Sequence, residues 1–159
     1  MKKILLILLL ASFHAFADFE IWNSAGDQSI KFYLDLEILS AESEEAVELI
    51  EEMVIFIKKT ERDTKLYEYY ISKDKKRISL TEHYKNDAAA LKHVLNFQNG
   101  PYQETFFKLM KVNSFQVMGP VSEELINSLE GLTDDFRIKV DGFKRNNSLK
   151  SLSIFLNSS

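Results

Sequence analysis

Apolar and polar residues alternate along the first well-patterned segment of the chain, residues 30–39. Within the sequence IKFYLDLEIL, alternate positions are apolar: Phe32, Leu34, Leu36 and Ile38. A period of two is typical of a strand that buries one face and turns the other to solvent. We therefore predict a strand here, with these four side chains in the core.

The next segment, residues 43–59, changes to a helical period. Ser43 can cap its start, and Lys58 and Lys59 suit the negative end of a helix dipole. Apolar residues recur at intervals of three and four: Val47, Ile50, Val54 and Ile57. We predict an amphipathic helix that packs on a sheet through this stripe and turns its glutamates to solvent.

The centre of the chain repeats the two patterns. The aromatic-rich KLYEYYIS, residues 65–72, and RISLTEHY, residues 77–84, predict two strands that a lysine-rich turn joins into an antiparallel pair. Asn86 or Asp87 can then cap a short helix over AAALKHVLNF, residues 88–97.

Two Gly-Pro pairs mark the next boundaries. The first pair ends the short helix, and residues 102–110 return to a helical pattern. The second pair ends FQVMGPV, residues 115–121, which predicts a fourth strand. The order strand, helix, strand, strand, helix, strand is the ferredoxin-like arrangement, an α+β fold with helices on one face of an antiparallel sheet.

Residues 122–159 extend beyond this domain. SEELINSLEGL predicts a short helix capped by Ser122, and DDFRIKVDGFKR, residues 134–145, predicts a strand with a glycine turn. The tail from Asn146 carries no pattern that assigns it. The chain thus divides into an N-terminal segment, a lead over residues 18–29, a domain over residues 30–121 and this extension.

The N-terminal segment, residues 1–17, has the pattern of a secretory signal peptide. Two lysines precede the apolar run Ile4–Leu10, which is too short to span a bilayer, and Ala15-Phe16-Ala17 forms a small-x-small cleavage site. We predict export, with a periplasmic or secreted mature chain that has no transmembrane span. An uncleaved anchor is the alternative interpretation.

Composition narrows the choice of partners and cofactors. A formal net charge of −4 argues against a nucleic-acid partner, because neutralising phosphates needs a basic stripe that this chain lacks. The chain has no cysteine, so its fold must be stable without disulfides. Beyond the signal peptide the histidines are His83 and His93, on different elements, and we predict no metal site.

One stretch carries a resemblance to a known family. LTEHYKNDAAALKH, residues 80–93, combines a strand end, a polar turn and a helix that bears a histidine. With the order of elements over the domain, it resembles the antibiotic biosynthesis monooxygenase domain, a dimeric α+β barrel family that includes quinol monooxygenases. Glu82 and His93 match the family's strand glutamate and helix histidine, whereas Tyr84 stands where tryptophan is usual.

The resemblance implies an assembly and a place for the site. In the family, two ferredoxin-like protomers join their sheets into a barrel, and each protomer keeps a cavity between its own sheet and helices. We therefore expect a homodimer, in agreement with a sheet whose second face needs a cover. The C-terminal extension could instead cover that face or swap across the dimer.

The resemblance also implies an activity: cofactor-independent oxidation of a small quinol or phenol by O2, without metal or flavin. Such a reaction needs a base for the phenolic proton and a dry cavity in which the anion can pass an electron to oxygen. His93 suits the base because imidazole titrates near neutrality. Tyr84 could orient the ring or donate to its oxygen, and Glu82 could hold the histidine or a water.

Structural interpretations of the same residues stay open. His93 can line a wall or pair with a loop carbonyl, and Glu82 can hold backbone amides. Phe97, Tyr102 and Phe106 are candidates for contact with a planar ligand, with Tyr102 as a lid, although aromatic residues at such spacings more often belong to the core.

A non-catalytic function is the main alternative. The chain could be a binding module for an aromatic or haem-like ligand outside the cytoplasm. Haem-degrading relatives of the fold carry an asparagine in the first strand, and IKFYLDLEIL has none. That absence argues against haem degradation and leaves haem binding through His93 open. An interaction protein with a filled core is a third possibility.

Overall fold

The computed structural model describes residues 26–39 and 43–142. The predicted signal peptide and the tail from Asn146 lie outside the described residues. The elements follow in this order: β1 (Ile30–Ile38), α2 (Ser43–Thr60), β2 (Thr64–Ile71), β3 (Arg77–Tyr84), α3 (Asp87–Gln98), α4 (Gln103–Leu109), β4 (Met110–Met118), α5 (Glu123–Ser128) and β5 (Asp135–Arg137).

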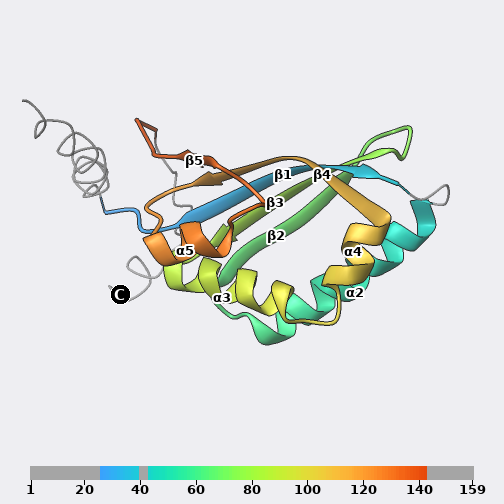
Figure 1. Ribbon diagram of the computed structural model, residues 1–159, viewed down its shortest axis with the longest axis horizontal. Helices are drawn as coiled ribbons and strands as arrows, with labels where there is room; N and C mark the ends of the chain where they lie inside the picture. The colour runs from blue at the N-terminus through green and yellow to red at the C-terminus, as the bar shows by residue number, and fades with distance from the viewer. Residues whose placement is uncertain (1–25, 40–42, 143–159) are drawn as a thin grey trace, which may run out of the picture.

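The strands form one sheet in the order β2-β3-β1-β4-β5. The central strand β1 is antiparallel to β3 and to β4, and β2 is antiparallel to β3. Figure 1 shows α2, α3 and α4 on one face of this sheet, while the described residues place no helix on the other face. The predicted ferredoxin-like α+β arrangement is confirmed.

Alternation along β1 separates a core face from an outer face. Ile30, Phe32, Leu34 and Leu36 are buried, and Ile38 is partly buried against the same core. The predicted apolar face of this strand is thus confirmed, with its last member at the margin.

The buried stripe of α2 differs from the predicted one. Its buried residues are Ala46, Leu49, Met53 and Ile57. Of the predicted residues Ile57 is buried, whereas Val47 is 37% exposed. Both stripes recur at three and four, so periodicity alone cannot choose between them. Contact with the sheet selects the side that carries Leu49 and Met53.

The fourth strand begins earlier than predicted. β4 starts at Met110, directly after α4, and not at Phe115. Its pairing with β1 shifts at a bulge, so that Val112 pairs with Leu36 and Ser114 pairs with Asp35. The extra residue shifts the phase of the alternation from Met110 and Val112 to Phe115 and Val117, so the strand shows no single period of two along its length.

The extension completes the core of its own chain at the β4 edge. Leu125 and Leu129 are almost fully buried, and α5 packs on α3. β5 pairs parallel with the end of β4, with Phe136 opposite Val117. Of the strand predicted over residues 134–145, the structure forms Asp135–Arg137, and residues 143–145 lie outside the described residues.

The outer sheet face is polar. Tyr33 Oη donates to Ser79 Oγ at 3.4 Å, and Arg77 forms an ion pair with Asp35. Dimerisation through this face stays a prediction. Over residues 26–39 and 43–142, no helix is both long enough and apolar enough to cross a membrane.

Candidate functional site

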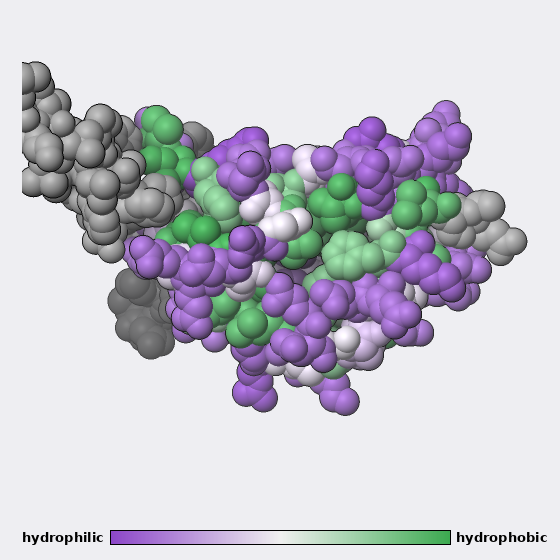
Figure 2. All heavy atoms as spheres, viewed as in Figure 1, coloured by the Kyte–Doolittle hydropathy of each residue, from purple (hydrophilic) through white to green (hydrophobic). Residues whose placement is uncertain are grey.

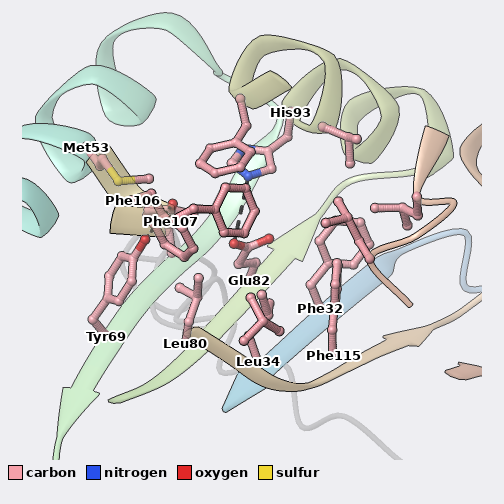
Figure 3. A pocket seen from close by; sticks show the side chains of 16 residues that line it. Phe32, Leu34, Met53, Tyr69, Leu80, Glu82, His93, Phe106, Phe107 and Phe115 are labelled. Carbon is pink, nitrogen blue, oxygen red and sulfur yellow. Dashed lines mark hydrogen bonds and ion pairs between the residues drawn. The ribbon is translucent and has the colours of Figure 1, made fainter. Parts of the chain in front are cut away.

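A cavity of about 60 Å³ lies between the sheet and the helices. Its lining is mostly aromatic and aliphatic and comprises Phe32, Leu34, Met53, Tyr67, Tyr69, Leu80, Glu82, His93, Val94, Phe97, Phe106, Phe107, Val112, Phe115, Leu129 and Leu132. Figure 3 shows His93 reaching toward the sheet from α3 and Glu82 rising toward it from β3. Glu82 supplies a carboxyl and His93 an imidazole to a wall whose other side chains are apolar or are tyrosines.

Aromatic rings hold the apolar part of the wall. The rings of Phe97 and Phe106 meet edge to face at 5.3 Å between centroids, and those of Phe32 and Phe115 at 5.1 Å. Such edge-to-face contacts are the favoured arrangement of paired rings. They give the cavity a firm boundary on the α4 and β4 side.

The cavity adjoins a hollow at the surface. This hollow, of about 350 Å³, shares Phe107, Val112, Phe115 and Leu132 with the cavity lining. Phe107 is 39% exposed. Figure 2 shows hydrophobic side chains reaching the surface among hydrophilic ones on one face of the molecule. These four residues separate the cavity from the surface hollow.

His93 bridges two glutamates. Its Nδ1 lies 3.0 Å from Glu61 Oε2, and its Nε2 lies 3.8 Å from Glu82 Oε1. The first distance is a hydrogen bond, whereas the second is an ion-pair distance that exceeds a hydrogen bond. All three side chains are almost fully buried. The imidazole is therefore directed at a carboxylate through each of its nitrogens.

Glu82 is held from its other side by Tyr84. The phenol of Tyr84 donates to Glu82 Oε2 at 2.5 Å, and its ring lies 5.2 Å from the His93 ring. Both residues stand on β3 two positions apart, so alternation places them on the same, helix-facing side of the sheet. The strand pattern that buries Leu80 buries this polar pair as well.

Glu61 is anchored just beyond the end of α2. Asn96 Nδ2 donates to Glu61 Oε1 at 3.0 Å, and Thr64 Oγ1 donates to Glu61 Oε2 at 3.1 Å. Asn96 follows His93 by three residues on α3, so the helix presents both to the same partner. The carboxylate is thus satisfied by three side-chain contacts from two other elements.

Two tyrosines of β2 supply the remaining polar atoms of the wall. The hydroxyls of Tyr67 and Tyr69 lie 2.8 Å apart, and the Tyr67 ring lies 5.6 Å from the His93 ring. Burial, first of all, raises the pKa of Tyr67 well above its ordinary value. Both hydroxyls are therefore protonated donors at neutral pH.

Burial and charge set the protonation of the three central groups. Burial raises the pKa of Glu82, against the opposing effects of His93 and of the Tyr84 hydrogen bond. Burial alone would lower the pKa of His93, but the Glu82 and Glu61 carboxylates outweigh it and raise that pKa. Burial acts to raise the pKa of Glu61 too, yet the His93, Asn96 and Thr64 contacts prevail and lower it.

These shifts divide the roles of the two carboxyls. Glu61, with its lowered pKa, is the ionised acceptor for His93 Nδ1–H. Glu82, with its raised pKa, is the carboxyl that faces the cavity and titrates closer to neutrality. A carboxyl tuned upward by burial is suited to exchange a proton with a bound molecule.

The structure brings together four of the six residues that the sequence singled out. Glu82, His93, Phe97 and Phe106 all line the cavity. Tyr84 lies behind Glu82, fully buried, and does not line the cavity.

Tyr102, the predicted lid, is placed elsewhere. It packs against Phe56, with 5.5 Å between ring centroids, and borders a separate hollow of about 10 Å³.

Glu61 is the main residue that sequence reasoning did not single out. One signal was available: in KKTERD a glutamate follows the lysines at the end of a predicted helix. The helix dipole disfavours a carboxylate at that end, so a glutamate there points to a specific partner. That partner, His93, lies 32 residues further along the chain, and spacing could not have identified it.

The described residues of the site suit neither a metal ion nor haem. Within the described part of the chain, no group of three or more His, Cys, Asp or Glu side chains could hold a metal ion. Haem does not fit the residues present, because the cavity measures only about 60 Å³ and His93 is directed at Glu61 and Glu82 through both nitrogens. No step is therefore assigned to haem.

Comparison with solved structures shows a likeness of fold. MupZ from Pseudomonas fluorescens superimposes with a TM-score of 0.58 at 19% identity, over 75% of this chain and 96% of that one. A conserved protein of unknown function from Bacteroides thetaiotaomicron, named as a possible oxidoreductase, gives a TM-score of 0.50 at 15% identity, over 57% and 96%. Likeness at such identities establishes the fold and leaves activity to be argued from the site.

A third solved structure bears on the resemblance seen in the sequence. A candidate antibiotic biosynthesis monooxygenase from Bacteroides thetaiotaomicron gives a TM-score of 0.45 at 18% identity, which is too distant to carry an argument. No protein-family profile and no curated protein matches the chain. What is shared is therefore the ferredoxin-like fold.

Proposed function

We propose that this protein oxidises a small phenol or quinol with O2 inside the cavity, without a bound cofactor. The observation that carries the proposal is the Glu82–His93 pair, which is buried and lines an aromatic cavity. A carboxyl with a raised pKa beside an imidazole is an acid–base pair suited to ionising a phenol. The apolar remainder of the wall suits an aromatic ring and dissolved oxygen.

We propose Glu82 as the base that takes the phenolic proton, in place of His93, which the sequence suggested. His93 already directs one nitrogen at Glu61 and the other at Glu82, so its own lone pair is not turned to a ligand. Glu82 takes the phenolic proton: the substrate O–H bond breaks and a carboxyl O–H bond forms. The hydrogen bond from Tyr84 and the charge of His93 stabilise the carboxylate before this step.

The reaction balances with oxygen alone. The phenolate gives an electron to O2, the two radicals combine at a ring carbon, and the peroxide formed there takes the proton back from Glu82 to give a hydroperoxide. The C–H bond at that carbon and the O–O bond then break, water leaves and a carbonyl remains. One phenol and one O2 thus yield one quinone and one water, with all electrons supplied by the substrate. The dry wall favours the electron transfer because the phenolate is poorly solvated there.

The cavity size limits the substrate. About 60 Å³ far exceeds what one water needs, at least about 10–15 Å³. It is also far below the typical pocket for a drug-sized ligand, about 300–1,000 Å³. We therefore propose a substrate with a single ring, which enters past Phe107 and Leu132 where the surface hollow adjoins the cavity.

Oxygen uptake by the purified protein tests the proposal. With hydroquinone, catechol and 4-methoxyphenol as probes, we expect uptake above the rate of autoxidation. Glu82→Gln keeps the shape of the side chain and removes the base, so uptake should fall by about 10²–10⁴-fold. The matched control is Glu68→Gln, which changes an exposed carboxylate on β2. Equal uptake by wild type and Glu82→Gln would contradict the proposal.

Binding without turnover is the second candidate function. It is favoured by the position of Tyr84, which lies outside the cavity lining and so cannot orient a ligand directly. Calorimetric titration with the same phenols distinguishes the two functions. Saturable binding with no oxygen uptake supports a binding module, whereas uptake that follows binding supports the enzyme.

Export and dimerisation belong to the proposal as well. The signal-peptide pattern of residues 1–17 supports a site of action outside the cytoplasm. The helix-free outer face of the sheet supports pairing of two copies. Size-exclusion chromatography with light scattering should show twice the mass of the mature chain, and a monomer at micromolar concentration would contradict the dimer.

A further inference from the structure

Glu61 has a place that the proposed reaction does not yet use. It borders two hollows at the molecular surface, of about 530 Å³ and about 260 Å³, and the smaller of them shares Tyr67 with the cavity lining. Its other side meets His93 Nδ1. Glu61 does not line the cavity, whereas His93 and Glu82 do. The Glu61 side chain is 3% exposed, so its carboxyl lies beneath these hollows and in contact with the imidazole.

The three side chains form a continuous line from surface to cavity. From the outside inward, the contacts are Glu61 Oε2 to His93 Nδ1 at 3.0 Å and His93 Nε2 to Glu82 Oε1 at 3.8 Å. The imidazole contacts both carboxyls, one through each of its nitrogens. Histidine can accept a proton at one nitrogen while it releases another from the second.

We propose that Glu61, His93 and Glu82 form a proton path that carries protons between the cavity and bulk solvent without opening the cavity mouth. Glu61 is its solvent-side end. The inference deepens the proposed function and rests on it for its purpose: Glu82 takes a proton from the phenol and returns one to the peroxide, and the path lets it exchange these protons with solvent while the cavity stays closed.

Each transfer conserves atoms and charge. The path operates from the neutral imidazole with its hydrogen on Nδ1, which leaves a lone pair on Nε2. The Glu82 O–H bond breaks as an N–H bond forms at His93 Nε2. The Nδ1–H bond of His93 breaks as an O–H bond forms at Glu61 Oε2, and Glu61 then loses this proton to water in the surface hollows. The imidazole is left with its hydrogen on Nε2, and rotation of the ring about its Cβ–Cγ bond resets the path. The 3.8 Å gap must shorten to about 3 Å for the first transfer, which is within reach of a carboxyl rotation.

Other ionisable groups flank the path without interrupting it. Inside the protein, phenols face it from β2 and β3: Tyr67, Tyr69 and Tyr84. Around the two hollows stand charged side chains from α2, the following loop, β2 and α3: Lys58, Arg62, Asp63, Lys65 and Lys92. The buried phenols keep their protons because burial raises their pKa values, and the mostly basic rim favours an ionised Glu61.

A purely structural role is the competing explanation. Glu61 also accepts hydrogen bonds from Asn96 and Thr64, so it could serve only to fasten α3 to the end of α2. The two explanations differ in kinetics. A fastening role affects how well the site is formed, whereas a path role affects how fast protons reach Glu82.

Infrared spectroscopy after a rapid drop in pH measures that rate directly. The probe is the protonated carboxyl band of Glu82 in the full-length protein with no ligand, assigned by its loss in Glu82→Gln. We expect Glu61→Gln to slow the appearance of this band by at least about tenfold. Formate, a small carboxylate that can enter the surface hollows, should restore the rate.

Two control variants make the result decisive. Thr64→Val removes one anchor of Glu61 and keeps its carboxyl, so the band should appear close to the wild-type rate. Glu68→Gln removes an exposed carboxylate and should also leave the rate unchanged. An unchanged rate in Glu61→Gln overturns the path. So does equal slowing in Thr64→Val and Glu61→Gln without rescue by formate.

The outcome is separable from that of the proposed function. If Glu61→Gln slows protonation and wild type consumes no oxygen with any phenol, the path stands and the enzymatic proposal falls. If phenols are oxidised and the protonation rate is unchanged in Glu61→Gln, the enzyme stands and protons leave through the cavity mouth.

Discussion

The same pair of residues occurs on both faces of the sheet. On β3, Tyr84 donates to Glu82 at 2.5 Å on the helix-facing side. On β2, Tyr70 donates to Glu68 at 2.6 Å on the outer side. In each pair the two residues stand two positions apart on one strand, so the local geometry is alike. The surroundings differ completely.

Burial distinguishes the Tyr84–Glu82 pair from the Tyr70–Glu68 pair. Tyr84 is fully buried and Glu82 is 3% exposed, whereas Tyr70 is 58% exposed. Burial, then the Glu82 charge, raises the pKa of Tyr84 well above its ordinary value. The pKa of Tyr70 is raised mainly through its contact with Glu68, and burial comes last among the causes. The same tyrosine–glutamate contact thus has a carboxyl with a raised pKa where it is buried beside a histidine.

Replacement of each tyrosine by alanine should give the largest difference in stability between the Tyr84–Glu82 pair and the Tyr70–Glu68 pair. Tyr84→Ala removes a ring that packs on Phe32 and His93, at 5.0 Å and 5.2 Å between centroids. We expect the free energy of unfolding to fall by about 3–5 kcal/mol. Tyr70→Ala should leave it unchanged, because that ring is mostly in solvent. Urea unfolding measures both, and equal losses would show that burial does not distinguish the pairs.

Removal of the two hydroxyls alone should give a smaller difference. Tyr84→Phe leaves a buried carboxylate oxygen without its donor, so we expect a loss of about 1–3 kcal/mol in the free energy of unfolding. It should also raise the pKa of Glu82 further, because the hydrogen bond that lowers it is gone.

Tyr70→Phe is the control, with no measurable change expected. Its partner Glu68 is exposed, so water can replace the tyrosine hydroxyl as the hydrogen-bond donor to the carboxylate in this variant. A stable Tyr84→Phe protein with an unshifted Glu82 carboxyl band would contradict the assigned role of the hydroxyl.

The pH dependence of stability should sharpen the comparison further. The folded-state pKa of His93 is raised above 6.5, so the folded chain keeps a proton that the unfolded chain loses. That stabilisation is complete below pH 6.5 and is lost as the pH rises through the folded pKa. Glu82 acts in the same direction from pH 4.5 upward. One proton contributes a slope of at most about 1.4 kcal/mol per pH unit.

Urea unfolding at a series of pH values measures this slope. His93→Gln should abolish the decline above pH 6.5, and Glu82→Gln should reduce the part that begins near pH 4.5. Glu68→Gln, in the exposed pair, should leave the wild-type profile intact. A wild-type profile that rises above pH 6.5 would contradict the raised pKa of His93.

Much of the framework was accessible from the sequence. Alternation in residues 30–39 and 77–84 identified β1 and β3 and placed Glu82 and Tyr84 on one face of the sheet. The polar turn and cap identified α3, and Asn86 indeed accepts the Ala89 amide. These are local properties, since a strand or helix period is a property of consecutive residues.

Other features depended on contacts that no local pattern records. The bulge in β4 concealed the first half of that strand, and two equally periodic stripes on α2 hid which one meets the sheet. Tyr102 follows a break that suggested a lid, but it packs on Phe56, away from the cavity. Each difference arises where tertiary packing chooses between local alternatives of similar quality.

The candidate site shows the same division most clearly. The sequence by itself determined the fold class, the side of β3 that carries Glu82 and the presence of a histidine on the following helix. Only the tertiary structure decided that this side is buried, that it encloses a cavity and that Glu61 joins His93 across 32 residues. The reason is physical: periodicity specifies direction along one element, whereas burial and a long-range charge contact depend on how separate elements pack against each other.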